Sequence, residues 1–258
     1  MAFLSLDGCS LYYELHGPPV GAAPVLVFAH GAGGNHLSWW QQVPHFAPRY
    51  TCLTFDHRSF GQSTGDDRPA GPSFTDDLCR LLDHLEIARV TIVAQSMGGW
   101  TALGCALHHP ERVERLVMCD THGGLYSDEL GKLWQAALGR MGGLAPGVHP
   151  AAGERMFREQ PALHFLYTQI VAMNPPASLM VGPWLVAEGR TPLARAAEVT
   201  MPVLVIAGEE DAVIPVPMLE IASRAFPNAQ LTYVPRAGHS VYFERADTFN
   251  VLLDRFLS

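Results

Sequence analysis

Short, uninterrupted apolar runs recur along the chain and constrain its fold more than any other feature. Each run has four or five residues and is rich in aliphatic and β-branched side chains. They cover residues 25–29, 51–55, 90–94, 116–119, 203–207 and 231–234. Strands that are apolar on both faces are typical of a parallel sheet buried between layers of helices. The runs therefore predict a central, mostly parallel sheet.

Segments with apolar residues three and four positions apart lie between these runs, as amphipathic helices require. They cover residues 74–85, 100–108, 218–226 and 246–257. Ser73, with Asp76 three positions later, resembles a capping box that begins the first of these helices. Upstream, residues 3–6 and 11–16 flank an Asp-Gly turn and predict a hairpin. Strands that alternate with helices predict an α/β fold with eight strands.

Residues 121–197 break this alternation. The segment is rich in Gly, Pro and large apolar side chains, but it has no short apolar run like those that predict the strands. We expect a helical lid, or cap, inserted into a core domain made of residues 1–120 and 198–258. Ordinary peripheral helices are the alternative interpretation.

Composition and charge limit the possible partners. The chain has 258 residues, of which 48% are hydrophobic, and its net charge of −8 without a basic run argues against nucleic-acid binding. The five cysteines are odd in number, scattered and free of C-x-x-C pairs, so we expect reduced core thiols. We find no signal peptide and no apolar run approaching the ~18 residues of a membrane span. The expectation is a cytoplasmic enzyme without a membrane span.

A serine follows the strand predicted at 90–94, and a helix follows the serine. The stretch reads Ala-Gln-Ser-Met-Gly over residues 94–98, with Ala94 in the first position of a G-x-S-x-G pattern. A serine on such a tight turn is exposed at the carboxyl end of the sheet, and the next backbone N–H faces the same space. We predict that Ser96 is a nucleophile. A serine that only caps a helix is the alternative.

A glycine-rich stretch at residues 30–34 follows the strand predicted at 25–29. Glycines let the backbone approach a ligand closely and direct N–H groups toward it. We assign the backbone N–H groups of Ala32 and Met97 to an oxyanion hole. A phosphate-binding loop is the alternative, but the Lys-Ser/Thr signature of such a loop is absent.

Two further strand ends carry an acid and a base. Asp211 follows the strand predicted at 203–207, and His239 follows the strand predicted at 231–234. Because ligands of open α/β sheets bind at the carboxyl ends of the strands, both side chains are expected near Ser96. His239 would accept the serine proton, and Asp211 would hold the imidazole in the required tautomer.

Other polar residues leave alternatives open. Asp120 ends the strand predicted at 116–119 and could replace Asp211, as could Glu209 or Glu210. Asp56, in the loop after the strand at 51–55, is interpreted as structural. No H-x-x-x-H or H-E-x-x-H pattern exists, so we expect no metal site. The candidate substrate-lining residues are His36, Trp100, Trp134, Trp184 and Val241.

The motifs at residues 30–31, 56–63, 95–99, 109–113 and 238–244 together resemble the α/β-hydrolase superfamily. The likeness is greatest to its small esterases, enol-lactonases, carbon–carbon bond hydrolases and cofactor-free haloperoxidases, and it covers nearly all of the chain outside residues 121–197. It implies the α/β-hydrolase fold, a lid over the sheet, no cofactor, an oxyanion hole near Ala32 and Met97, and the order Ser96, Asp211, His239. Dehalogenases and epoxide hydrolases of this superfamily carry Asp at the nucleophile position, so Ser96 argues against both activities.

Two positions depart from the family pattern. Ala94 replaces the usual first glycine of the turn, and Ser59 replaces a more usual glycine in the loop at 56–63. Neither change removes a chemical group from the predicted triad. We therefore expect hydrolysis of a carboxylic ester or lactone of a small, largely apolar molecule through an acyl-enzyme. The alternatives are a carbon–carbon bond hydrolase, a cofactor-free dioxygenase, or a small-molecule sensor without turnover.

Overall fold

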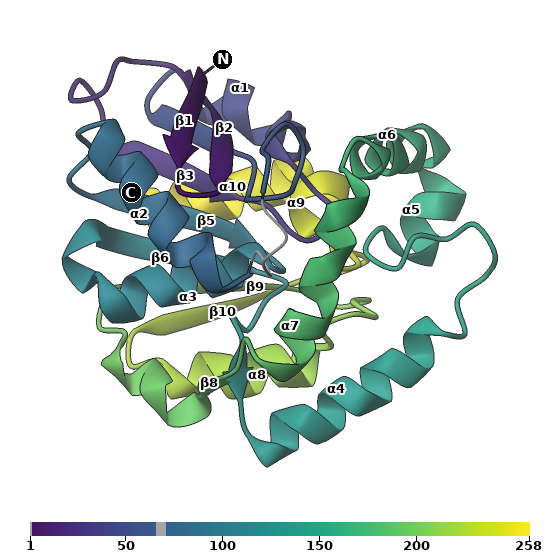
Figure 1. The fold of residues 1–258 in the computed structure, drawn as a ribbon. Coiled ribbons are helices and arrows are strands. Elements are labelled where there is room, and N and C mark those ends of the chain that lie inside the picture. The colour runs from purple at the N-terminus through teal and green to yellow at the C-terminus, as the bar shows by residue number, and fades with distance from the viewer. Residues whose placement is uncertain (1, 66–70) are drawn as a thin grey trace.

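The computed structural model describes residues 2–65 and 71–258 and is built around one eight-stranded sheet (Figure 1). The strand order is β1-β2-β4-β3-β5-β6-β9-β10. Pairs that involve β2 are antiparallel, and all the others are parallel. The predicted fold is thus confirmed. The bounds are β1 Ala2–Leu6, β2 Cys9–His16, β3 Val25–Ala29, β4 Thr51–Phe55, β5 Val90–Gln95, β6 Val113–Cys119, β9 Val203–Gly208 and β10 Ala229–Val234.

Helices cover both faces of the sheet, which explains why its strands are apolar on both sides. Alternate residues of one strand enter different cores, because side chains alternate between the two faces. In β5, for example, Ile92 packs in one core and Val93 in the other. The first core is completed by α2 (Phe74–His84), α3 (Gly98–His108) and α8 (Val216–Ala225), and the second by α1 (Gln42–Phe46), α9 (Val241–Glu244) and α10 (Ala246–Leu257).

The capping box predicted at Ser73 is wrong. Ser73 ends a 3₁₀ turn, η2 (Gly71–Ser73), and has helical angles with φ −91° and ψ −10°. A capping side chain needs an extended backbone to reach the N–H groups of the first turn. The Ser73 hydroxyl accordingly makes no capping hydrogen bond.

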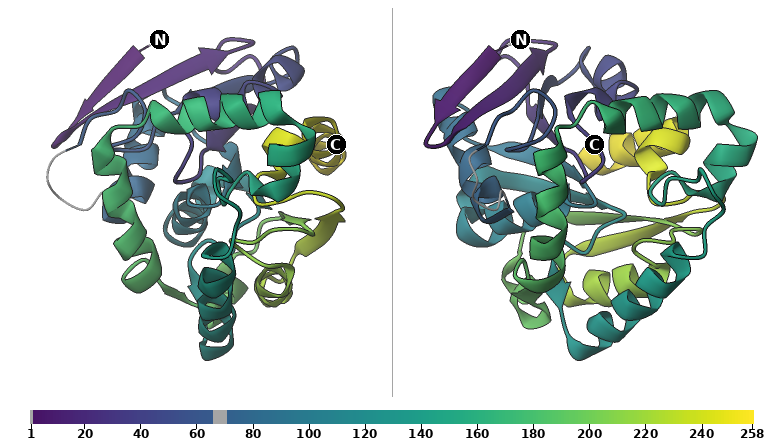
Figure 2. Two further views of the ribbon diagram at one scale, coloured as in Figure 1. Left: turned by 90° about the vertical axis from the view of Figure 1, so that its right-hand side faces the viewer. Right: turned by 45° about the vertical axis from the view of Figure 1, so that its right-hand side comes forward.

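Residues 121–197 form a mostly helical segment along one side of the sheet (Figure 2). The segment also holds two strands of two residues each, β7 and β8, which pair in parallel and which the sequence did not predict. Its elements are β7 Leu125–Tyr126, α4 Asp128–Met141, α5 Gly153–Glu159, α6 Pro161–Ala172, η4 Pro176–Met180, α7 Val181–Ala187 and β8 Thr191–Pro192; η5 Leu193–Glu198 then leads back to the sheet.

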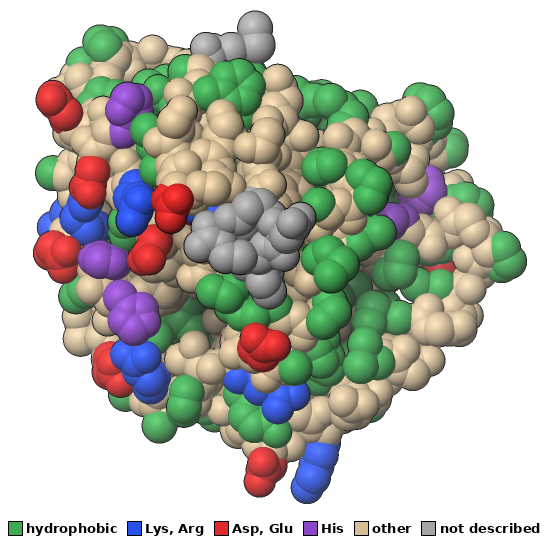
Figure 3. Space-filling model, in the orientation of Figure 1, with side chains coloured by type: hydrophobic (Ala, Val, Ile, Leu, Met, Phe, Trp, Pro, Cys, Tyr) green, Lys and Arg blue, Asp and Glu red, His purple; other side chains and the backbone are tan. Residues whose placement is uncertain are grey.

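Large apolar side chains of this segment remain exposed, and such side chains gather on the same side of the molecule (Figure 3). The most exposed are Phe165, Met173, Leu179 and Met180. Among the described residues no single helix is long and apolar enough to cross a membrane; only the bent pair Pro161–Ala172 and Pro176–Ala187, taken together, passes that test. All five cysteines are buried reduced thiols, as the sequence predicted.

Candidate active site

The turn that carries Ser96 is strained and tightly packed. Ser96 has a φ of +47°, in the left-handed region that non-glycine residues rarely occupy. A side chain at Gly98 would collide with the backbone carbonyl of Ala29, and one at Gly31 would collide with Gln95. Gly98 therefore lets α3 begin close to the end of β3, and Gly31 lets the loop after β3 pass close to the end of β5. The half-buried Ser96 lies at the carboxyl end of β5.

Three side chains from three strand ends form a continuous hydrogen-bonded chain. The Ser96 hydroxyl lies 2.8 Å from Nε2 of His239. On the other side of the ring, Nδ1 lies 2.8 Å from Oδ2 of Asp211. Because a carboxylate only accepts, Nδ1 carries the proton and Nε2 is free to accept one from the serine. This arrangement can activate a serine hydroxyl for attack on a carbonyl carbon.

The surroundings of His239 favour its charged form. Burial alone would lower the pKa of the imidazole, but the nearby charge and hydrogen bond of Asp211 raise it, and the charge of Asp120 adds to them. The net result is a pKa above the ordinary value of 6.5. The pair can therefore stabilise the imidazolium that forms when the serine loses its proton.

Asp120, the alternative acid, has a different set of partners. Its two carboxylate oxygens accept the backbone N–H groups of Gly208, at 2.9 Å, and Val241, at 3.0 Å. Burial and the charge of Asp211 raise its pKa to about 7. Asp120 thus connects β6 to β9 and to the helix after His239, whereas Asp211 holds the imidazole.

Among the described residues, the other two acids of the Asp211 loop are not bonded to the His239 ring. Glu209 and Glu210 are both exposed, and Glu210 forms an ion pair with Arg155. Asp211 itself is fixed by its own loop, since its Oδ1 accepts the N–H groups of Val213 and Ile214 at 2.7 and 2.8 Å. Its second oxygen, Oδ2, is the one that contacts His239.

Two backbone N–H groups beside Ser96 have no protein partner. Within residues 2–65 and 71–258, neither Ala32 nor Met97 donates its N–H to a protein acceptor. A hydrogen bond of 2.9 Å from Gly34 to the carbonyl of Gly31 closes the turn around Ala32. Met97 precedes the first residue of α3, where the positive end of the helix dipole favours negative charge. Unpartnered donors of this kind can hold an oxyanion.

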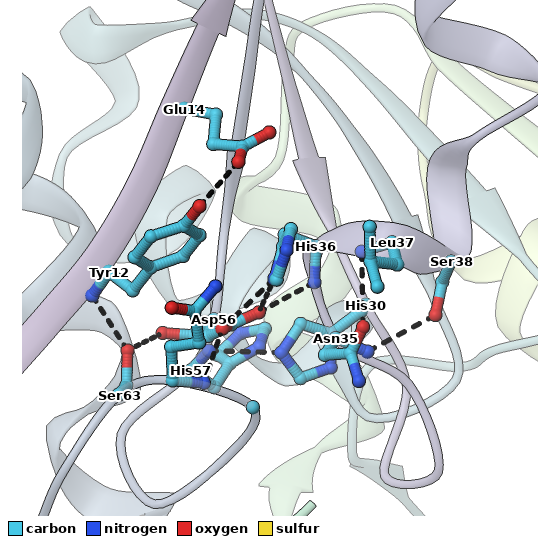
Figure 4. A network of polar contacts seen from close by, with 12 residues as sticks. Tyr12, Glu14, His30, Asn35, His36, Leu37, Ser38, Asp56, His57 and Ser63 are labelled. Atoms are coloured by element: carbon cyan, nitrogen blue, oxygen red, sulfur yellow. Dashed lines mark hydrogen bonds and ion pairs between the residues drawn. The ribbon is translucent and has the colours of Figure 1, made fainter. Parts of the chain in front are cut away.

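A buried network supports the glycine-rich loop (Figure 4). The carboxylate of Asp56 accepts the backbone N–H of His36 at 2.6 Å, its ring Nδ1–H at 2.8 Å, and the N–H of Gln62 at 2.7 Å. The ring of His36 also packs on Tyr12 and is only 6% exposed. The structure therefore places His36, a candidate lining residue, in a network that joins the loops after β3 and β4.

The 121–197 segment contacts the same glycine-rich loop through two asparagines. Asn174, between α6 and η4, donates to the carbonyl of Gly33 at 3.2 Å and accepts the N–H of Gly61 at 2.9 Å. Asn35 donates to the carbonyl of Ile170 at 3.0 Å. Sequence reasoning missed both residues. The one available signal was that Asn174 is the single asparagine in a segment rich in apolar side chains.

An apolar cavity of about 520 Å³ lies between α3, α4, α7 and α8. Its wall includes Trp100 and Trp134, two of the candidate lining residues, with the ring of His122 packed against both. Burial lowers the pKa of His122 to about 4, so its imidazole is neutral near pH 7. The volume is within the range of small-molecule sites.

The last two candidate lining residues lie elsewhere. Trp184 packs on Phe74 and lines a different hollow, and Val241 is fully buried with its N–H bonded to Asp120. Among the described residues, no three His, Cys, Asp or Glu side chains group as metal ligands would.

Known proteins share this fold and sequence pattern. Putative carbamate hydrolase RutD from Caulobacter vibrioides is 27% identical over 270 residues, which cover 100% of this chain and 98% of the relative. The 3-oxoadipate enol-lactonase 2 of Acinetobacter baylyi is 30% identical over 244 residues, covering 88% and 86%. The enol-lactonase structure from Burkholderia xenovorans LB400 has a TM-score of 0.82 at 25% identity, covering 99% of both chains.

The family comparison covers most of the chain. A model of the alpha/beta hydrolase fold matches residues 24–246, which include the carboxyl ends of β3, β5, β9 and β10, the strands that precede Ala32, Ser96, Asp211 and His239. Since one fold hosts many reactions, the match identifies the family and leaves the reaction to the chemistry of the site. The chain belongs to the α/β-hydrolase family.

Proposed function

We propose that this chain is a serine hydrolase that cleaves the carboxylic ester or lactone bond of a small, largely apolar molecule. The observation that carries the proposal is the pair of 2.8 Å contacts that links Ser96, His239 and Asp211. The unpartnered N–H groups of Ala32 and Met97 beside it supply a place for the negative charge of a tetrahedral intermediate.

The steps follow from this geometry. The Ser96 hydroxyl attacks the carbonyl carbon while its proton passes to Nε2 of His239. The carbonyl oxygen becomes an oxyanion held by Ala32 and Met97, and the imidazolium then protonates the leaving oxygen. Water, deprotonated by the same histidine, releases the acyl group and restores the serine.

Residues 121–197 are proposed to act as a lid domain over a core of residues 1–120 and 198–258. The contacts of Asn174 and Asn35 with the glycine-rich loop support this assignment. The cavity beside Trp100 and Trp134 is proposed to hold the apolar part of the substrate. Ser96, Asp211 and His239 do not line it, and its link to the site is α3, which begins two residues after Ser96 and carries Trp100. The names of relatives, an enol-lactonase and a putative carbamate hydrolase, support acyl-group hydrolysis.

Ser96→Ala tests the nucleophile directly. We expect hydrolysis of p-nitrophenyl esters to fall by at least roughly 10⁴-fold, because the acyl-enzyme can no longer form. Covalent labelling by a fluorophosphonate, mapped by mass spectrometry, should occur at Ser96 in the wild-type protein and be absent from the variant. An unchanged thermal unfolding temperature is the control for the fold. Turnover that persists in Ser96→Ala would refute the mechanism.

A further inference from the structure

A histidine of the 121–197 segment lies beside the catalytic histidine. His149 is in the loop between α4 and α5, and this loop is bonded to the residue after His239: the Ser240 hydroxyl donates to the carbonyl of Ala151 at 2.8 Å. The backbones also meet nearby, since a side-chain carbon at Gly238 would lie 3.8 Å from the Cα of Gly153. The loop that carries His149 is therefore held against the His239 loop.

The other side of His149 faces the oxyanion loop. A side-chain carbon at Gly33 would lie 3.7 Å from Cε1 of His149 and 3.6 Å from the hydroxyl of Tyr167. The His149 and Tyr167 rings pack with their centres 5.3 Å apart. Because Gly33 directly follows Ala32, the imidazole of His149 lies close to the loop of the proposed oxyanion hole, while its own loop is bonded to the residue after His239.

The hydrogen bonds of His149 determine its tautomer. The backbone N–H of Ala151 donates to Nδ1 at 3.2 Å, so the proton of the neutral ring is on Nε2. Burial lowers the pKa of His149, and the neighbouring His164 and His239 lower it further, which keeps the ring neutral near pH 7. Among the described residues, the Nε2–H of His149 has no hydrogen-bond partner. The Nε2 atom is also not one of the buried polar atoms, so it is reachable from outside the protein. It is thus a free donor that is not enclosed by protein.

We propose that His149 is a substrate-binding residue whose Nε2–H donates a hydrogen bond to an oxygen of the ester or lactone group. This inference rests on the proposed function. In that mechanism the oxyanion faces Ala32 and Met97, and the leaving oxygen faces His239. A donor close to both of these loops can reach the oxygens of the reacting group, and its hydrogen bond strengthens as negative charge develops on them.

The test compares His149→Phe with His149→Gln. Phenylalanine keeps the planar ring and loses both nitrogens, whereas glutamine places an amide N–H₂ near the position of Nε2. We expect kcat/KM for p-nitrophenyl acetate and butyrate to fall by roughly 10- to 100-fold in His149→Phe, mainly through kcat, because the donor is worth most in the transition state. His149→Gln should recover most of the loss. His108→Phe is the control: it replaces an exposed histidine at the last position of α3, and its kcat/KM should equal that of the wild type.

Each outcome has a distinct meaning. Wild-type activity in His149→Phe overturns the inference. An equal loss in both variants, with unchanged unfolding temperatures, also overturns it, because the shape of the ring and not its donor would then matter. Fluorophosphonate labelling of wild-type Ser96 separates these results from a failure of the proposed function. Absence of both labelling and turnover in the wild-type protein contradicts the proposed function and this inference together.

Discussion

Two buried pairs of aspartate and histidine lie at the carboxyl ends of strands, and among the described residues only the imidazole of His239 is bonded to a serine hydroxyl. Asp211 and His239 approach within 2.8 Å, and so do Asp56 and His36. Both carboxylates are buried. On the side of the ring opposite Asp211, Nε2 of His239 contacts the Ser96 hydroxyl. The ring of His36 instead packs on Tyr12.

The difference lies in what else each carboxylate holds. Asp211 is bonded to its own loop through one oxygen and presents the other to the imidazole. Asp56 accepts backbone N–H groups from His36 and Gln62 as well as the imidazole, so it joins two loops. The same two side chains can thus serve chemistry in one place and architecture in another. Substitutions should separate these roles.

Of the substitutions in these two pairs, Asp211→Asn should have the largest effect on the chemical step. The amide is nearly the same size, but it favours the wrong tautomer of His239 and removes the charge that stabilises the imidazolium. We expect kcat for p-nitrophenyl esters to fall by roughly 10³- to 10⁴-fold with little change in KM. Circular dichroism should show an intact fold. A loss below tenfold would mean that Asp211 does not act with His239.

Asp56→Asn should instead act on stability. The substitution leaves a buried amide where three donors require an acceptor, so we expect the free energy of unfolding to fall by about 2–4 kcal/mol. Urea unfolding measures this loss. The folded fraction should retain kcat within roughly tenfold of the wild type, because the triad is untouched. If Asp56→Asn kept its stability and lost its activity, the contrast between the two pairs would fail.

The sequence predicted the core of the fold because periodicity and strand-end chemistry are local. Six apolar runs, each confirmed as a strand, place Ser96, Asp211 and His239 at the same edge of a parallel sheet. The identity of the acid could not be settled in this way. Asp120 and Asp211 both follow apolar strands, and only the packing of the His239 loop shows which one reaches the imidazole.

The residues that the sequence did not reveal depend on long-range packing. His149 lies in a Gly- and Pro-containing loop without periodicity, and its position follows from a bond between Ala151 and Ser240. Asn174 acts across more than a hundred residues of sequence. Neither contact has a local pattern that a sequence could display, because it forms only when the 121–197 segment is packed on the sheet.

The pH dependence of the reaction tests the electrostatics of the Asp211 pair. His239 must be neutral to accept the serine proton, and its pKa is raised above 6.5. We therefore expect kcat/KM to fall about tenfold per unit as the pH drops below that raised pKa. Asp211→Asn should move the midpoint to lower pH, since burial then acts without the opposing carboxylate, whereas Asp56→Asn should leave it in place. A profile that is flat from pH 5 to 8 would argue against His239 as the base.

The smallest expected effect concerns Glu244, a buried acid in the helix that follows His239. Burial raises its pKa from 4.5 to about 7, although the N–H of Gly238 donates to one of its oxygens. Between these two values the folded chain holds a proton that the unfolded chain has lost, so stability must fall as the pH rises through this window. The loss is complete above about pH 7.

Glu244→Gln removes this ionisation while keeping an oxygen to accept the N–H of Gly238. We expect the variant to match the wild type at pH 5 and to be more stable at pH 8 by about 1–3 kcal/mol, which thermal unfolding at both pH values can detect. Asp120, whose pKa is also raised to about 7, should leave some pH dependence in the variant. Glu209→Gln, which replaces an exposed acid, is the matched control and should leave the stability at both pH values unchanged. Identical pH slopes for the wild type and Glu244→Gln would show that Glu244 does not hold a proton in this window.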